Sequence, residues 1–324
     1  MASVRTSVYA IPLVMRHHRL KHALIVTDQG IVKAGLLKRL TEALDEYEVQ
    51  YSIYDEVVPN PTIDNVEAAR KVYLENGCDA LIGIGGGSAI DCAKVVGARI
   101  AQPFMSVSAM GGILKVWRKT PTLFAVPTTA GTGSETTLAA VILDDKKHHK
   151  YPINSFPLIP RYAILDGKLT TTLPKHITST TGMDALTHAV EAFIGGSTTR
   201  LTRRLSIEAV ELIAKNLYTA YTDGENLKAR RMMLLAAYSA GGAFTRSYVG
   251  YVHAVAHSLG GKYGTPHGLA NAVLLPIVLR MYGEAAEKRL AMLARAAHVI
   301  DKEGTDHEIA TAFIDWIQEM NDKM

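Results

Sequence analysis

The sequence predicts an α/β domain with a parallel sheet, followed by an all-helical domain. Up to about residue 172, short β-branched runs alternate with segments whose apolar residues recur at helical spacing. Beyond residue 173 only helical segments follow. Strands separated by helices of this length indicate parallel βαβ units. Because a Thr-rich stretch and Pro174 intervene, we place the domains at residues 1–172 and 173–324.

Each element has its own local signal. Short buried runs predict strands at residues 23–27, 52–55, 80–84, 123–126 and 163–166. Apolar residues three and four positions apart predict helices between them at residues 32–46, 62–76 and 89–100. The same spacing predicts the helical domain as segments 175–194, 202–222, 225–247, 250–260, 268–282, 284–300 and 305–322.

The composition excludes several classes of protein. The 324 residues are 48% hydrophobic and 20% charged, which is ordinary for a globular enzyme. The net charge of +4 is scattered, so we expect no nucleic-acid partner. We expect no membrane span, because the longest uncharged stretches are short and contain Gly, His or Pro, and no signal peptide in residues 1–15. Cys78 and Cys92 are interpreted as reduced thiols of a cytoplasmic protein.

Two glycine-rich turns follow predicted strands. The first, GIGGGS at residues 83–88, opens a helix, where the backbone can approach a ligand and the helix N-terminus attracts anions. Ser88 and Asp91 have the spacing of a capping box. The second turn, VPTTAGTGS at residues 126–134, adds hydroxyl and backbone donors. Either turn alone also fits a simple tight connection. Two of them at the carboxyl ends of parallel strands favour a nucleotide crevice.

Two charged residues belong to the same hypothesis. Asp28 directly follows the first predicted strand, where a carboxylate can bind the hydroxyls of an adenosine ribose and repel a 2′-phosphate. An aspartate before Gly30 is equally well explained as a turn former. Lys150, in a polar stretch before Pro152, is by itself an ordinary surface lysine.

The helical domain contains residues typical of metal sites. Asp184 and His188 are four positions apart and therefore share one helix face. Together with Glu191 they are also explained as the solvated face of that helix. His253 and His257 share a face of a segment that is apolar almost all round, and buried imidazoles need partners. We therefore expect His257 to be turned away from solvent.

His267 follows in the sequence TPHG and completes a set of one carboxylate and several imidazoles. Such donors suit Fe²⁺ or Zn²⁺. Beside a nucleotide crevice, the ion would polarise a carbonyl or an alkoxide. Ala254 stands where HExxH metalloproteases carry their glutamate, which disfavours peptide hydrolysis.

Over about residues 23–282 the sequence resembles the iron-containing (group III) alcohol dehydrogenases. The resemblance is carried by five motifs in the order and spacing of that family. They are VPNPT (58–62), GGGSAIDCAK (85–94), PTTAGTGSE (127–135), TGMDALTHAVEAF (181–193) and VHAVAHSLGGKYGTPHGLANAVLLP (252–276).

The resemblance implies a Rossmann-like NAD domain and a helical metal-binding domain of the dehydroquinate synthase type, with the active site in the cleft between them. It implies that the metal ligands are Asp184, His188, His253 and His267, and that His257 is an active-site histidine that does not bind the ion. With Gly86, Asp91 and Ser134 of the two turns, the expected NAD site comprises Asp28, Asn60, Gly86, Gly87, Ser88, Asp91, Thr128, Thr129, Thr132, Ser134 and Lys150.

The expected reaction is hydride transfer between NAD(H) and a small primary alcohol or aldehyde, in a homodimer or larger homo-oligomer. The resemblance also implies that the helical domain lacks the last helices of the family, which follow beyond the position of Met324. Two alternatives remain at this stage. One is a lyase like the dehydroquinate synthases that uses NAD transiently, and the other is an inactive, shortened relative.

Overall fold

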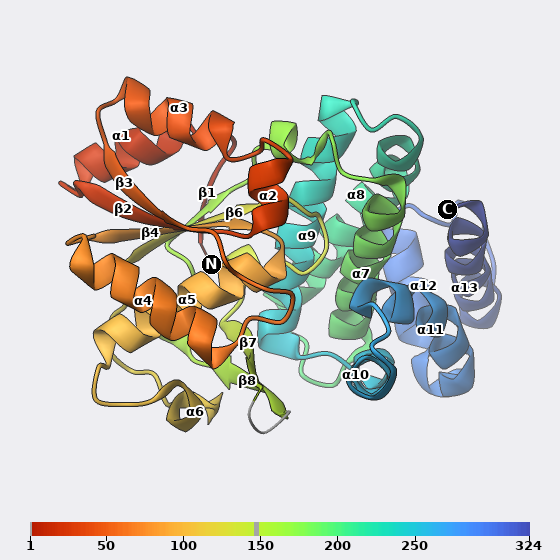
Figure 1. Cartoon of the computed structure of the whole chain (residues 1–324). Helices are drawn as coiled ribbons and strands as arrows, with labels where there is room; N and C mark the ends of the chain where they lie inside the picture. The colour runs from red at the N-terminus through yellow and green to blue at the C-terminus, as the bar shows by residue number, and fades with distance from the viewer. Residues whose placement is uncertain (1, 146–148) are drawn as a thin grey trace. The chain divides into compact units, whose positions relative to one another are not determined.

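The computed structural model describes residues 2–145 and 149–324, and the chain forms two compact units (Figure 1). The first unit contains the chain up to Thr128 together with Ser134–Leu169. The second contains Thr129–Gly133 together with Thr170–Met324. Part of the second glycine-rich turn therefore clusters with the helices that follow it in the sequence.

The first unit is built on a six-stranded sheet in which every described pair of neighbours is parallel. Across the sheet the strands are β1 (Ser3–Arg5), β9 (Tyr162–Ile164), β6 (Thr122–Pro127), β4 (Ala80–Gly85), β2 (His22–Val26) and β3 (Gln50–Tyr54). The chain runs outwards from β2 to β3 and then returns to β4 on the other side of β2. The strand order thus reverses between β2 and β4, which is where open α/β sheets bind their ligands.

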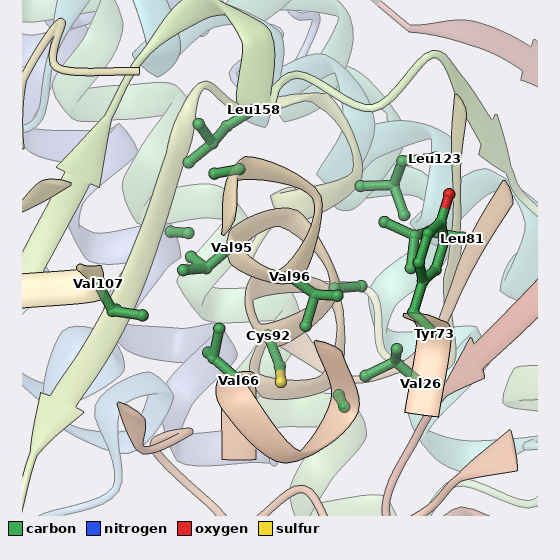
Figure 2. Packing of buried hydrophobic residues seen from close by; sticks show 14 of the residues in the cluster. Val26, Val66, Tyr73, Leu81, Cys92, Val95, Val96, Val107, Leu123 and Leu158 are labelled. Carbon is green, nitrogen blue, oxygen red and sulfur yellow. The ribbon is translucent and has the colours of Figure 1, made fainter. Parts of the chain in front are cut away.

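Alternating side chains fill a core on each face of this sheet. Leu24 and Val26 belong to one cluster with residues of α4 (Ile63–Glu75) and α5 (Gly87–Ala101), part of which Figure 2 shows. The other cluster contains Ala23 and Ile25. It is covered by α1 (Ala10–His17) and α3 (Lys38–Glu46), on the opposite side of the sheet in Figure 1. Since each buried Val, Leu or Ile side chain contributes about 1.5–3 kcal/mol, both layers stabilise the sheet.

A small second sheet was not predicted. It pairs β7 (Ala139–Asp144) with β8 (His149–Asn154) in antiparallel fashion, and β5 (Gly112–Ile113) adds to β8 in parallel. The strand β8 is polar and contains Pro152, which removes a backbone donor and weakens a strand signal. Two short elements, β1 and α1, also lie in a stretch for which no element was predicted, as does α6 (Val107–Met110).

The predicted helix at 32–46 was wrong in its continuity. The structure has α2 (Gln29–Lys33) and α3 with a break between them. Gly35 lies in the break with φ +70°, a left-handed conformation that interrupts a right-handed helix. The apolar spacing continued across the break, which is why the sequence read as one helix.

Over the residues that the structure describes, the regular elements of the second unit are helices. Its long helices are α7 (Lys175–Ile194), α8 (Arg200–Thr222), α9 (Leu227–Ser247), α10 (Tyr251–Tyr263), α11 (His267–Tyr282), α12 (Glu284–Ala296) and α13 (Asp306–Lys323). Every helix predicted for this region is confirmed. The central helix α7 packs against α8, α9, α11 and α12, so nearly its whole carboxyl-terminal half is buried. Among the described helices, none combines the length and the apolar character needed to cross a bilayer.

Candidate metal centre and coenzyme site

Three helices of the second unit bring four predicted residues together. Asp184 and His188 lie one turn apart on α7, His253 lies in the first turn of α10, and His267 begins α11. One possible ligand atom from each lies within 4.8 Å of the others. Asp184, His188 and His253 are at most 5% exposed, and His267 is partly buried. Reading the α7 residues as a solvated face was therefore wrong, because neighbouring helices surround α7.

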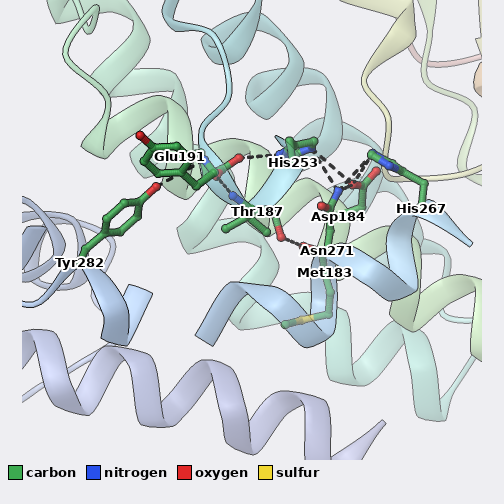
Figure 3. Close-up of polar contacts among 10 residues, drawn as sticks. Met183, Asp184, Thr187, Glu191, His253, His267, Asn271 and Tyr282 are labelled. Atoms are coloured by element: carbon green, nitrogen blue, oxygen red, sulfur yellow. Dashed lines mark hydrogen bonds and ion pairs between the residues drawn. The ribbon is translucent and has the colours of Figure 1, made fainter. Parts of the chain in front are cut away.

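The side chains of the cluster converge on one point. Asp184 Oδ1 lies 3.5 Å from His267 Nε2 and 3.9 Å from His253 Nε2. Figure 3 marks the contacts among these residues with dashed lines. The His188 ring stacks on the His253 ring with centroids 4.4 Å apart. Asn271 Nδ2 donates a 2.6 Å hydrogen bond to Asp184 Oδ1. The carboxylate is thus oriented by an amide as well as surrounded by imidazoles.

The electrostatics of the cluster suit a cation. Burial lowers the pKa of His188 to about 3, against the opposing effect of Asp184. Its imidazole is therefore neutral near pH 7 and keeps a lone pair for a ligand. Burial by itself would raise the pKa of Asp184, but His188, His267 and His253 hold it below its ordinary value. One ionised carboxylate with imidazoles is a donor set that fits Fe²⁺ or Zn²⁺.

A buried carboxylate that the sequence analysis did not assign to the site lies behind His253. Glu191 Oε2 is 2.5 Å from His253 Nδ1, and Glu191 Oε1 accepts a hydrogen bond from the backbone N–H of Val252 at 2.8 Å. The available signal was its spacing, since Glu191 follows Asp184 by seven positions and therefore lies on the same helix face.

His257 lies beside the cluster but is exposed. Its ring centroid is 5.0 Å from that of His267 and 6.2 Å from that of His253. The expectation that it would be turned away from solvent was wrong. Helix α10 packs mainly against α11, so the apolar character of its sequence does not bury it on all sides.

The first predicted coenzyme residues gather where the strand order of the sheet reverses. Asp28 caps α2, because its Oδ1 accepts a 3.0 Å hydrogen bond from the N–H of Ile31. Gly85, at the end of β4, has φ +148°. A Cβ added to Gly85 would lie 2.8 Å from Ala89 Cβ and 3.3 Å from Asp28 Oδ2. The end of β2 and the glycine turn after β4 are therefore adjacent, with no room for a side chain between them.

Three further predicted residues meet although they are far apart in the sequence. The Asn60 backbone N–H donates to Ser88 Oγ at 3.3 Å, and Lys150 Nζ donates to Asn60 Oδ1 at 2.7 Å.

Ser88 is not a helix cap, so the predicted capping box was wrong. The N-cap of α5 is Gly86, and Asp91 instead accepts hydrogen bonds from Ser134 Oγ (2.6 Å) and from the N–H of Val141 (2.9 Å).

A buried polar network ties α5 to the segment that follows the second turn. Lys94 is 1% exposed and donates to the carbonyls of Thr137 and Ala139 and to Thr137 Oγ1. Burial lowers the pKa of Lys94 to about 8, against the opposing effects of Asp91 and Glu135. Burial likewise raises the pKa of Glu135 to about 7. Lys94 and Glu135 both lie within the motifs quoted above, but no role was predicted for either of them.

The second turn itself is packed tightly. Thr128 is buried and its N–H donates to the carbonyl of Gly85 at 2.9 Å. A Cβ on Gly131 would lie 2.7 Å from Thr181 Cβ on α7. Gly133 has φ +62°, and its Cβ would lie 2.8 Å from the carbonyl oxygen of Ala237 on α9. These two glycines are therefore required by helix packing. Thr129 and Thr132 are partly exposed on the same turn.

Two family models match almost the whole chain. The model described as iron-containing alcohol dehydrogenase matches residues 5–167. The model described as the C-terminal part of the Fe-containing alcohol dehydrogenase family matches residues 178–324.

Individual proteins agree with the family models. Alcohol dehydrogenase 4 of Saccharomyces cerevisiae is 41% identical over 276 residues, which cover 85% of this chain and 72% of that protein. Lactaldehyde reductase of Escherichia coli is 37% identical over 296 residues, covering 91% and 77%. A crystal structure of 1,3-propanediol oxidoreductase has a TM-score of 0.95 at 35% identity, covering 100% of this chain and 85% of that one.

A second similar structure was solved with a nucleotide bound. Sulfoacetaldehyde reductase from Bifidobacterium kashiwanohense, in complex with NAD⁺, has a TM-score of 0.88 at 29% identity and covers 99% of this chain and 84% of that one. Neither the lyase nor the inactive relative is favoured, because the matched models and these relatives are all dehydrogenases or reductases. From its motifs, its fold and these matches, the chain belongs to the iron-containing alcohol dehydrogenase family and is an oxidoreductase.

Proposed function

We propose that this enzyme transfers a hydride between NAD(H) and a small primary alcohol or aldehyde, with a divalent metal ion bound by Asp184, His188, His253 and His267. The observation that carries the proposal is the convergence of these four side chains, three of them buried, whose possible ligand atoms lie within 4.8 Å of one another. The lactaldehyde reductase and 1,3-propanediol oxidoreductase among the similar proteins support a small oxygenated substrate.

The metal is Fe²⁺, and Zn²⁺ is the second choice for the same donors. When bound, the ion supplies Lewis-acid polarisation of the substrate oxygen. Asp184 and His188 are buried, so bulk water has little access to them. The pKa of Asp184 is lowered, which favours its ionised form, and the pKa of His188 is lowered to about 3, which favours its neutral form. Asn271 orients the carboxylate through its 2.6 Å hydrogen bond.

His257 is proposed to relay the proton of the alcohol or to hydrogen-bond the substrate. Its ring lies 5.0 Å from that of the ligand His267, and it is exposed. An exposed imidazole can exchange protons with water at physiological pH. We favour a supporting role, because the alcohol proton can also pass to water.

The coenzyme is proposed to bind at the glycine turn of the first unit. Asp28 would accept hydrogen bonds from the adenosine ribose, and the N-terminus of α5 would bind the pyrophosphate. Asp91 and Ser134, which bind each other, would hold the second turn in place. NAD⁺ in the sulfoacetaldehyde reductase structure supports this choice of coenzyme. The remaining proposed contacts are Asn60, Gly86, Gly87, Ser88, Thr128, Thr129, Thr132 and Lys150.

We further propose that the enzyme works in the cytoplasm as a homodimer or larger homo-oligomer. Support for a reducing compartment comes from Cys78 and Cys92, which are buried and not joined to each other. The mass of the purified protein in solution, measured by light scattering, tests the assembly.

The deciding experiment combines metal analysis with turnover. Protein purified under anaerobic conditions is expected to carry iron or zinc and to oxidise NADH in the presence of short aliphatic aldehydes. Removing the ion with a chelator should abolish the reaction, and adding Fe²⁺ should restore it. Protein that binds neither metal, or that turns over equally well after chelation, would contradict the proposal.

A further inference from the structure

Glu191 is a fully buried carboxylate that touches a proposed metal ligand without belonging to the ligand set. It lies on α7 one turn beyond His188, and its side chain is 0% exposed. Its Oε2 lies 2.5 Å from Nδ1 of His253. Figure 3 shows Glu191 on the side of the His253 ring opposite Asp184. Burying a charge is costly unless it is paired, so this contact requires an explanation.

The second carboxylate oxygen binds the start of α10. Glu191 Oε1 accepts a 2.8 Å hydrogen bond from the N–H of Val252, in the first turn of that helix. The N-cap of α10 is Gly250, which has no side chain to bind the unpaired N–H groups there. Glu191, which belongs to α7, therefore supplies to α10 the side-chain acceptor that Gly250 cannot provide. A negative charge is also favourable at a helix N-terminus.

The contact with Nδ1 indicates which nitrogen of His253 carries a proton. A carboxylate oxygen accepts hydrogen bonds, so the 2.5 Å contact with Glu191 Oε2 favours Nδ1 of His253 as the donor. In a neutral imidazole this leaves the lone pair on Nε2. Nε2 is the atom that faces the cluster, 3.9 Å from Asp184 Oδ1. The opposite tautomer would point an N–H at the ion.

We propose that Glu191 is a positioning residue of the metal centre, which holds His253 in the tautomer that presents Nε2 to the ion and anchors the first turn of α10. The inference rests on the metal site proposed above. Gly250 supports it, because a Cβ at that position would lie 2.8 Å from Glu191 Oε1. The residue at position 250 must be small for the carboxylate to reach both partners.

Glu191→Gln tests the proposal with little change of shape. The amide keeps one acceptor oxygen and gains an NH₂ group, so it cannot accept from both Val252 and His253. We expect the affinity for Zn²⁺, measured by competition with a chelator, to fall ~10–100-fold. The visible absorption of the Co²⁺-loaded protein, which reports ligand geometry, should change as well. Unchanged affinity and an unchanged Co²⁺ spectrum would overturn the proposal.

Two further variants separate positioning from general damage. Glu208→Gln removes another carboxylate of the second unit, which accepts a 3.2 Å hydrogen bond from Ser239, and should keep the wild-type affinity. Gly250→Ala leaves the charge of Glu191 intact but displaces its Oε1, and should weaken Zn²⁺ binding in the same direction as Glu191→Gln. A Gly250→Ala protein with wild-type affinity and an undisturbed Co²⁺ spectrum would count against the proposal.

A measurement on the wild-type protein decides the matter even if Glu191→Gln does not fold. ¹⁵N NMR of the Zn²⁺-loaded, histidine-labelled protein should show His253 protonated at Nδ1, with its ring signals assigned through their correlations to the protein backbone. Protonation at Nε2 would overturn the proposal. A wild-type protein that binds no Zn²⁺, Co²⁺ or Fe²⁺ would instead refute the metal site itself. Tight wild-type binding with an unaffected Glu191→Gln protein would refute only the role of Glu191.

Discussion

Replacing Glu135 with Gln is expected to remove a pH-dependent loss of stability from the first unit. Glu135 is 1% exposed, and within the described part of the chain its Oε1 has no hydrogen-bond partner. Burial raises its pKa from 4.5 to about 7, against the opposing charge of Lys94. The folded protein therefore disfavours the ionised form. Glutamine has nearly the same shape and does not ionise.

The size of the effect follows from the two pKa values. They differ by about 2.5, and each unit is equivalent to about 1.4 kcal/mol, so the total is about 3 kcal/mol. Between pH 4.5 and 7 the folded state holds the proton while the unfolded state releases it. The contribution of this group to the free energy of unfolding is therefore fully present below pH 4.5 and is lost as the pH rises through about 7. Relative to wild type, Glu135→Gln should gain about 3 kcal/mol over this range.

The assay is urea unfolding of both proteins from pH 4.5 to 7.5, with a chelator present so that metal binding does not contribute. At pH 4.5, residue 135 is largely uncharged in both proteins, which provides an internal reference. The difference between the two free energies of unfolding should then grow with pH in favour of the variant. Parallel pH profiles would refute the reasoning, because they would mean that Glu135 ionises in the folded protein as easily as in the unfolded chain.

The other predictions concern the reaction. His253→Ala should lose its metal and its turnover, and full metal occupancy with full activity would remove His253 from the ligand set. Asp28→Gly should raise the use of NADPH relative to NADH, because the carboxylate no longer repels a 2′-phosphate; a wild-type enzyme that prefers NADPH in steady-state kinetics would contradict this. His257→Gln should keep its metal and lose roughly 10²–10⁴-fold in kcat if His257 relays the proton, or mainly raise KM if it binds substrate. Unchanged kcat and KM across pH would exclude His257 from the site.

The class of fold and most of its helices and strands could be predicted from the sequence. Buried runs such as residues 80–84 and the helical spacing in residues 175–194 report local burial, which needs no knowledge of partners. The spacing of Asp184 and His188 likewise placed them on one face of a helix that exists. The motifs indicated which loops would gather at the sheet edge, and the structure brings Asp28 next to the first glycine turn.

Three other features depend on tertiary packing, which local sequence patterns do not report. The tertiary structure broke the helix at 32–46, where apolar spacing continued but Gly35 adopts φ +70°. It exposed His257 while burying His253 one turn away, because α10 packs mainly on one side. It paired Glu191 with His253, two residues 62 positions apart. Hydrogen bonds between residues so far apart in the sequence depend on how the helices pack against one another. That packing cannot be inferred from the residues adjacent to either partner in the sequence.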